Sequence, residues 1–122
     1  MILKWNKYRL FTEARKEYWD KPCVYIQADS SGKPIRVGKA SKGLNARYRG
    51  GTGYALDAAM HNSGNLLFVA TVIPETSGLV ESELIWRGRN CLPCNNLGKK
   101  STPLKRVELK HEGDSPDFSG FQ

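Results

Sequence analysis

Long hydrophobic runs are absent from this chain of 122 residues. The longest, Leu66–Ile73, has eight residues with Thr71 among them, whereas a membrane-spanning helix needs roughly 20 apolar residues. Lys4 and Lys7 interrupt the apolar residues at the beginning, so the pattern of a secretory signal is missing as well. These absences predict a cytoplasmic protein with no membrane segment.

Cysteine is scarce, and its count of three is odd. Reduced thiols are expected in a chain of this composition without an export signal. Cys91 and Cys94 form a C-x-x-C pair, which is half of a zinc site if Cys23 and His61 complete it, or a redox pair. A thiol or zinc protein built on this pair therefore remains an alternative.

Acidic residues are also few, with 12 Asp and Glu against 19 Lys and Arg, and the formal net charge is +7. The positive excess is concentrated in residues 1–60. Such a field is typical of proteins that bind a polyanion such as nucleic acid, although a soluble basic surface has the same balance. The side chains expected to contact phosphate groups are Lys4, Lys7, Arg9, Lys39, Lys42 and Arg49.

The most informative stretch is an expected β-hairpin. Cys23–Ala28 alternates between two faces, and Asp29–Gly32 is rich in turn-forming residues. If pairing of the second strand begins at Lys33, Tyr25 lies opposite Arg36 and shares a face of the sheet with it. The sequence thus predicts one apolar face that packs inward and one polar face that holds a phenol beside a guanidinium.

Further elements are expected on both sides of this hairpin. Leu66–Ile73 is apolar on both faces and rich in β-forming residues, which is typical of a buried central strand. A helix that starts near Ser77 and runs to about Arg89 follows it. Residues 1–10 show no clear period. The remaining expected elements are a helix over Phe11–Trp19, short helices over Leu44–Arg49 and Tyr54–His61, a strand over Arg106–Leu109 and a loose tail over 111–122.

The helix after the central strand carries two glutamates with different expected surroundings. At about 100° per residue, Glu81 falls within an arc of roughly 140° that also contains Val80 and Leu84, whereas Glu83 falls outside it and is expected to be solvated. Because an unpaired carboxylate is costly to bury, Glu81 should have a cation beside it, either an arginine or a metal ion. An ordinary structural ion pair is the alternative.

Five fragments occur in an order that resembles the GIY-YIG nuclease superfamily: CVYIQ, RVGKA, LNAR, ESELI and PCNN. The resemblance covers residues 22–98 and implies an α+β fold with a three-stranded antiparallel sheet flanked by helices. Residues 22–98 would form the catalytic core, preceded by a basic and aromatic segment with a helix (1–21). A basic C-terminal extension with a loose tail (99–122) would follow it.

The resemblance also implies an activity, the hydrolysis of phosphodiester bonds with one divalent ion, Mg²⁺ or Mn²⁺. The positions that match the family's motifs are Tyr25, Gly38, Arg47, Glu81 as the metal ligand and Asn96, for which Asn95 is a rival.

Three departures from the family pattern are present. Cys23 and Val24 replace the glycine and isoleucine of the first motif. Arg36 replaces the tyrosine of the second motif, and Gly51 stands where a histidine or tyrosine is common, a place that Tyr54 or His61 would have to fill.

The resulting hypothesis is a metal-dependent endonuclease in which Tyr25 acts as general base or positions water, and Arg47 holds the phosphate. Arg36 and Lys39 would favour the charged form of the phenol. DNA is favoured over RNA as substrate, and a homodimer or a protein partner would supply specificity. The main alternative is a catalytically impaired module of the same fold that only binds nucleic acid.

Overall fold

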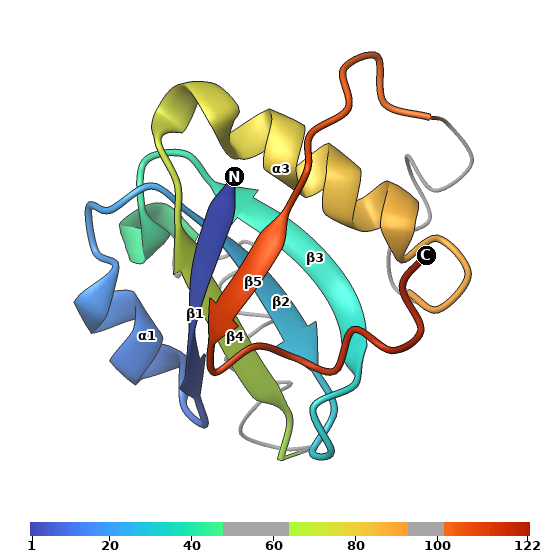
Figure 1. Ribbon diagram of the computed structural model, residues 1–122. Coiled ribbons are helices and arrows are strands. Elements are labelled where there is room, and N and C mark those ends of the chain that lie inside the picture. The colour runs from blue at the N-terminus through green and yellow to red at the C-terminus, as the bar shows by residue number, and fades with distance from the viewer. Residues whose placement is uncertain (48–63, 93–101) are drawn as a thin grey trace.

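The computed structural model describes residues 1–47, 64–92 and 102–122, and in these residues the fold is α+β with a five-stranded mixed sheet (Figure 1). The strands lie side by side in the order β3-β2-β4-β1-β5. The expected α+β class is therefore confirmed, but the expectation of three strands is wrong. In chain order the elements are β1 Ile2–Tyr8, α1 Phe11–Glu17, β2 Cys23–Ala28, β3 Pro34–Ala40, the 3₁₀ helix η1 Leu44–Arg47, β4 Leu66–Thr71, α3 Pro74–Arg87 and β5 Lys110–Gly113.

The two additional strands come from the ends of the sequence. β1 pairs antiparallel with β4, and β5 pairs parallel with β1. Leu3 and Trp5 are buried while Lys4 and Asn6 are exposed, an alternation that marks residues 2–8 as a strand. The expected strand over Arg106–Leu109 does not form, because the pairing with β1 begins only at Lys110.

The expectation of a loose tail over 111–122 is wrong for a physical reason, namely that its aromatic side chains are used in packing. His111 accepts a hydrogen bond from the indole Nε1 of Trp5 at 2.9 Å. Phe118 stacks on His111 with ring centroids 4.0 Å apart and contacts Phe121 edge to face. The tail therefore forms part of the core on one face of the sheet.

The hairpin of β2 and β3 has a register that differs from the expected one by two residues. Tyr25 lies opposite Gly38 rather than Arg36, because an irregularity between Gln27 and Ala28 takes up part of the turn. A shift of two residues preserves the faces, since side chains alternate with a period of two. Arg36 therefore still shares a face with Tyr25, now as a diagonal neighbour.

Both faces of the sheet are covered, so the prediction that one face packs inward and the other is polar is wrong. α3 packs on the face that carries Val24 and Ile26. α1 and the start of η1 cover the face that carries Tyr25, through Phe11 and Leu44 among others. All six residues of β2 are buried, and the expected buried central strand is confirmed in β4.

The start of α3 and the end of α1 differ from the expected helix boundaries. α3 starts at Pro74, a residue suited to a first turn because it lacks a backbone N–H. This start lies three residues before the expected Ser77, which is buried and donates a hydrogen bond to the Pro74 carbonyl at 2.9 Å. α1 ends at Glu17, two residues earlier than expected. Within the described ranges, no helix has the length and apolar character needed to cross a membrane.

Candidate active site

The ring of Tyr25 lies against the backbone of Gly38 on the neighbouring strand. A Cβ atom at residue 38 would come within 2.7 Å of the ring carbon Cε2 and 2.5 Å of the hydroxyl oxygen, closer than real Cβ atoms approach other atoms. Tyr25 is only 2% exposed and packs in the cluster beneath α1. Glycine at position 38 thus allows the phenol to extend across β3, which is an edge strand of the sheet.

Two cationic residues lie on the same edge strand. Arg36 is half-buried, pairs with Gln27 and shares the face of Tyr25. Lys39 pairs with Val24 and so belongs to the opposite face, which α3 covers. The Lys39 Nζ lies 3.3 Å from where a Cβ of Gly78 would be, so this ammonium is close to the first turns of α3. The β3 edge therefore carries one cation on each face.

The two glutamates of α3 are placed differently from what the sequence suggested. Glu83, expected to be solvated, is completely buried, whereas Glu81 is half-buried. The expectation for Glu83 is wrong because the buried residues of α3 are Ser77, Val80, Glu83 and Leu84, so the core-facing stripe is centred further toward Glu83 than the apolar residues alone indicated.

Glu83 has two arginines as partners of its carboxylate. It accepts hydrogen bonds from Arg106 at 2.9 and 2.8 Å, from Arg87 at 2.7 Å and from the Val107 backbone N–H at 3.2 Å. Several hydrogen bonds lower the pKa of Glu83 to about 2, and the one from the Arg106 guanidinium has the largest effect. Burial opposes them. Arg87, four residues after Glu83, was the available sequence signal. This cluster joins α3 to the C-terminal segment and is structural.

Glu81 projects from a different side of the helix. Two residues of α-helix correspond to about 200°, so Glu81 and Glu83 lie on opposite flanks of α3. Glu83 faces the segment that leads into β5, while Gly78, one turn before Glu81, lies next to Lys39 of β3. Glu81 therefore lies on the flank directed to the β3 edge, which Tyr25 approaches from the opposite face.

Arg47 is the last residue of η1, and the backbone around the start of η1 fixes its position. Gly43 has a φ of +93°, and any side chain there would collide with the Trp19 backbone, so a glycine is needed between β3 and η1. The Leu44 N–H then donates to the Tyr18 carbonyl at 2.8 Å and ties η1 to the end of α1. The backbone of Arg47 thus follows β3 on the α1 side, the side of Tyr25.

Several predicted residues lie outside the part of the chain that the structure describes: Tyr54, His61, Arg49, Asn95, Asn96 and Cys94. Of the expected phosphate contacts, Lys4 and Lys42 are exposed at separate positions, and Lys7 and Arg9 line a common hollow. Cys23 is buried beneath α1, whereas Cys91 follows α3 and lies against Gly120. The fold does not bring these two thiols to one site.

A divalent ion would have few protein ligands here. Among residues 1–47, 64–92 and 102–122, His, Cys, Asp and Glu form no group of three or more that would hold a metal ion. Glu81 would bind an ion alone, with water in the other positions. That donor set fits Mg²⁺, which keeps several waters and is bound through one or two carboxylates.

Tyr25 and Arg36 thus lie on the α1 face of the sheet, followed by η1, whereas Lys39 and the Glu81 flank of α3 lie on the opposite face at the β3 edge. The functional interpretation depends on these residues and on their placement. Comparison of the chain with protein-family models, curated proteins and solved structures finds no match.

Proposed function

We propose that this protein is an endonuclease that hydrolyses phosphodiester bonds in nucleic acid, with DNA as the favoured substrate. Its chemistry would be like that of the GIY-YIG superfamily, which its motifs resemble. The observation that supports it most is the contact of the Tyr25 phenol with the backbone of Gly38, which makes the glycine of the second motif necessary. The same contact fixes where the phenol lies relative to the β3 edge.

Tyr25 would act on the attacking water, as general base or by orienting it for in-line attack on phosphorus. Its ring is held on both sides, by the α1 cluster and by Gly38, so the hydroxyl direction is fixed before substrate arrives. Such positioning removes much of the entropic part of the barrier. Arg36, diagonal to Tyr25 on the same face, would favour the phenolate form.

The phosphate needs cations that stay charged as negative charge develops on its oxygens. Arg47 and Lys39 would supply them. Glu81 would hold one Mg²⁺ or Mn²⁺ ion, which when bound supplies charge stabilisation at the leaving oxygen. Glu83 would have no part in the chemistry, because both its oxygens are occupied by arginines.

The test is cleavage of plasmid DNA and of single-stranded DNA and RNA by the purified chain, with Mg²⁺, with Mn²⁺ and with EDTA. Cleavage that requires the metal is expected, and Glu81→Ala should lower its rate by about 100-fold or more. Glu75→Ala is the matched control, since Glu75 is an exposed carboxylate in the first turn of the same helix. Intact substrates under all conditions, or full activity in Glu81→Ala, would contradict the proposal.

The second candidate is a module that binds nucleic acid without cutting it. The presence of Arg36 at the position of the second-motif tyrosine favours it, because one of two phenols is lost. Gel-shift binding by the wild-type chain, together with intact substrates in the cleavage experiment, would support this candidate over the enzyme.

A further inference from the structure

The imidazole of His111 links the two ends of the chain. His111 is a half-buried residue of β5 that pairs with Leu3 of β1, on the face of the sheet that α3 covers. Its Nδ1 accepts the hydrogen bond from the Trp5 indole at 2.9 Å, and the ring of Phe118 stacks on it with centroids 4.0 Å apart. This side chain therefore connects β1 and β5 to the terminal strap, residues 114–122.

The hydrogen bond between Trp5 and His111 can form in one direction only. An indole N–H is a donor and offers no acceptor, so the imidazole has to accept at Nδ1 and carry its proton on Nε2. In the imidazolium ion both nitrogens carry protons and neither accepts. Protonation of His111 would therefore leave the N–H of Trp5, a residue that is only 1% exposed, without its acceptor.

The surroundings of His111 also oppose a positive charge on its ring. Burial lowers the pKa of His111 below its usual value of 6.5, and the Arg87 guanidinium of α3 lowers it further. β1 and the terminal strap present aromatic rings to it. The charged residues Lys4 of β1 and Lys110 and Glu112 of β5 alternate with this position and belong to the other face of the sheet. Near pH 7 the ring is therefore neutral while the strap is in place.

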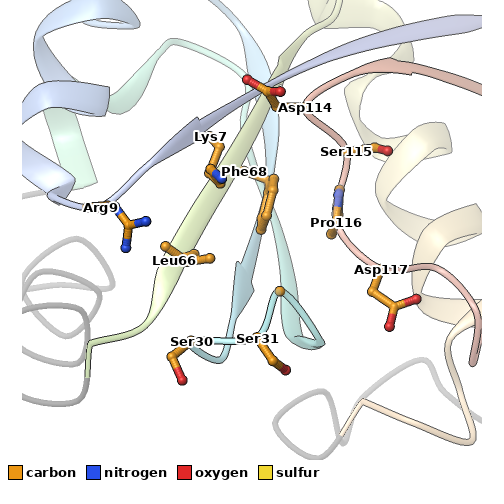
Figure 2. A pocket seen from close by; sticks show the side chains of 11 residues that line it. Lys7, Arg9, Ser30, Ser31, Leu66, Phe68, Asp114, Ser115, Pro116 and Asp117 are labelled. Atoms are coloured by element: carbon orange, nitrogen blue, oxygen red, sulfur yellow. The ribbon is translucent and has the colours of Figure 1, made fainter.

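The first half of the terminal strap is attached mainly through its backbone. Figure 2 shows residues 114–117 beside a hollow of about 360 Å³, and of these four residues only Pro116 is buried. The Asp114 N–H donates to the Trp5 carbonyl at 3.0 Å, and the Asp117 N–H donates to the Gly32 carbonyl at 2.9 Å. Because segments with few buried contacts open more readily than the core, this stretch can detach without global unfolding.

The second half of the strap lies on the last turn of α3, where the chain ends in Figure 1. The Gln122 N–H donates to the Arg87 carbonyl at 2.8 Å, and a Cβ on Gly88 would lie 2.7 Å from the Phe121 ring. Both phenylalanines of the strap pack against the core on this face of the sheet. Release of the strap would thus uncover apolar surface beside β1 and at the end of α3.

We propose that His111 is a pH-sensitive latch, which holds the terminal strap on the sheet when neutral and releases it when protonated. In the released form the ring is open to water and takes up a proton at the ordinary pKa of a histidine, about 6.5. Release is therefore favoured below about pH 6.5, by up to about tenfold per pH unit, until the pKa of the docked form is reached. Glu83 has a pKa of about 2 and stays ionised in this range, so its ion pair with Arg106 persists.

Native-state hydrogen exchange of the full chain at pH 7.5 and 5.5 tests the latch. Protection factors, which correct each amide for the effect of pH on its intrinsic exchange, should fall about fivefold for the Asp117 and Gln122 amides at the lower pH. They should also be at least about tenfold smaller than those of β2 and β4 at both pH values, because the strap opens locally.

Two variants identify the titrating group. His111→Asn keeps a side-chain oxygen that can accept from Trp5 but does not titrate, so its strap should be equally protected at the two pH values. The chain has two histidines, and His61→Asn, which removes the other one, is the matched control that should respond to pH like the wild type. Nitrogen-15 NMR of the wild-type chain should show His111 with an unprotonated Nδ1 at pH 7.5, a measurement that needs no variant.

Four results would each overturn the latch. These are a proton on Nδ1 of His111 at pH 7.5, strap protection that is the same at both pH values in the wild type, a fivefold fall that persists in His111→Asn, and strap amides as well protected as those of β2 and β4. Loss of the response in His61→Asn would also count against it. None of these measurements involves cleavage, so they are independent of whether the protein is a nuclease.

Discussion

The backbone of Gly38 lies directly against the aromatic ring of Tyr25, leaving no space for a side chain on residue 38. The two residues are paired across the β2–β3 ladder, so the contact is set by strand register rather than by a flexible loop. Among the described residues, β3 has a neighbouring strand on one side only, so the ring of Tyr25 extends toward an edge of the sheet.

Gly38→Ala should displace the Tyr25 ring. The added methyl group overlaps the ring, and overpacking of this kind costs about 1–3 kcal/mol. Denaturant unfolding should show that loss, and the cleavage rate should fall together with it. In Gly78→Ala, by contrast, the methyl group would meet only the end of the Lys39 side chain, so unchanged or raised stability is expected from the better helix former. Equal stability of Gly38→Ala and wild type would refute the tight contact.

Tyr25→Phe should separate the role of the hydroxyl from that of the ring. Packing is retained, so the free energy of unfolding should change by no more than about 1.5 kcal/mol, the value of one hydrogen bond. Cleavage should fall by about 100-fold, as for loss of a group that acts in the transition state. Tyr18→Phe is the control, because Tyr18 is a buried tyrosine of the same cluster whose hydroxyl accepts a hydrogen bond from Asn6 at 2.8 Å. Similar activity in both variants would argue against a catalytic phenol.

Glu83→Gln should lower stability without a direct effect on catalysis. The charge that joins Arg106 to α3 and pairs with Arg87 of the same helix is lost, and we expect the free energy of unfolding to fall by about 3 kcal/mol. Glu81→Gln should show the opposite pattern, little change in unfolding and a large loss of cleavage. Measurement of both properties on both variants decides whether the two glutamates have the separate roles described above.

Acid should remove the same stabilisation. The pKa of Glu83 is lowered to about 2 in the folded state, below the value of about 4.3 for an unperturbed glutamate. Its contribution is therefore fully present above about pH 5 and is lost progressively as the pH falls toward 2. Unfolding measured at pH 7, 4 and 2.5 should show wild type converging on Glu83→Gln. A constant difference between the two proteins over this range would contradict the assignment.

Phe118→Ala should destabilise the fold although it changes the C-terminal tail. The ring stacks on His111 and lies 6.0 Å from the Trp5 ring, and a half-buried phenylalanine should contribute about 2 kcal/mol, below the 3–5 kcal/mol of a fully buried one. Leu104→Ala is the matched control, since Leu104 is fully exposed and its loss should change stability by less than about 0.5 kcal/mol. Thermal unfolding of the two variants compares them directly.

Local sequence patterns were sufficient to predict the elements that depend on residues close together in the chain. The alternation in Cys23–Ala28 and the apolar run at Leu66–Ile73 predicted β2 and β4, because a buried strand needs apolar side chains on its covered faces. The turn residues at 29–32 predicted the reversal. The shared face of Tyr25 and Arg36 also followed from the sequence, since a two-residue change of register does not alter it.

The tertiary structure decided what depends on partners distant in the chain. Glu83 is buried because Arg106, 23 residues later, supplies its charge partner, and helical periodicity carries no information about such a partner. The C-terminal tail packs into the core because His111 and Phe118 contact the side chain of Trp5, which lies near the other end of the chain. The C-terminal segment lies beside the β2–β3 turn because the Asp117 N–H donates a hydrogen bond to the Gly32 carbonyl. Spacing along a chain relates the faces of neighbouring residues to one another, whereas only packing determines which face is covered and by which residues.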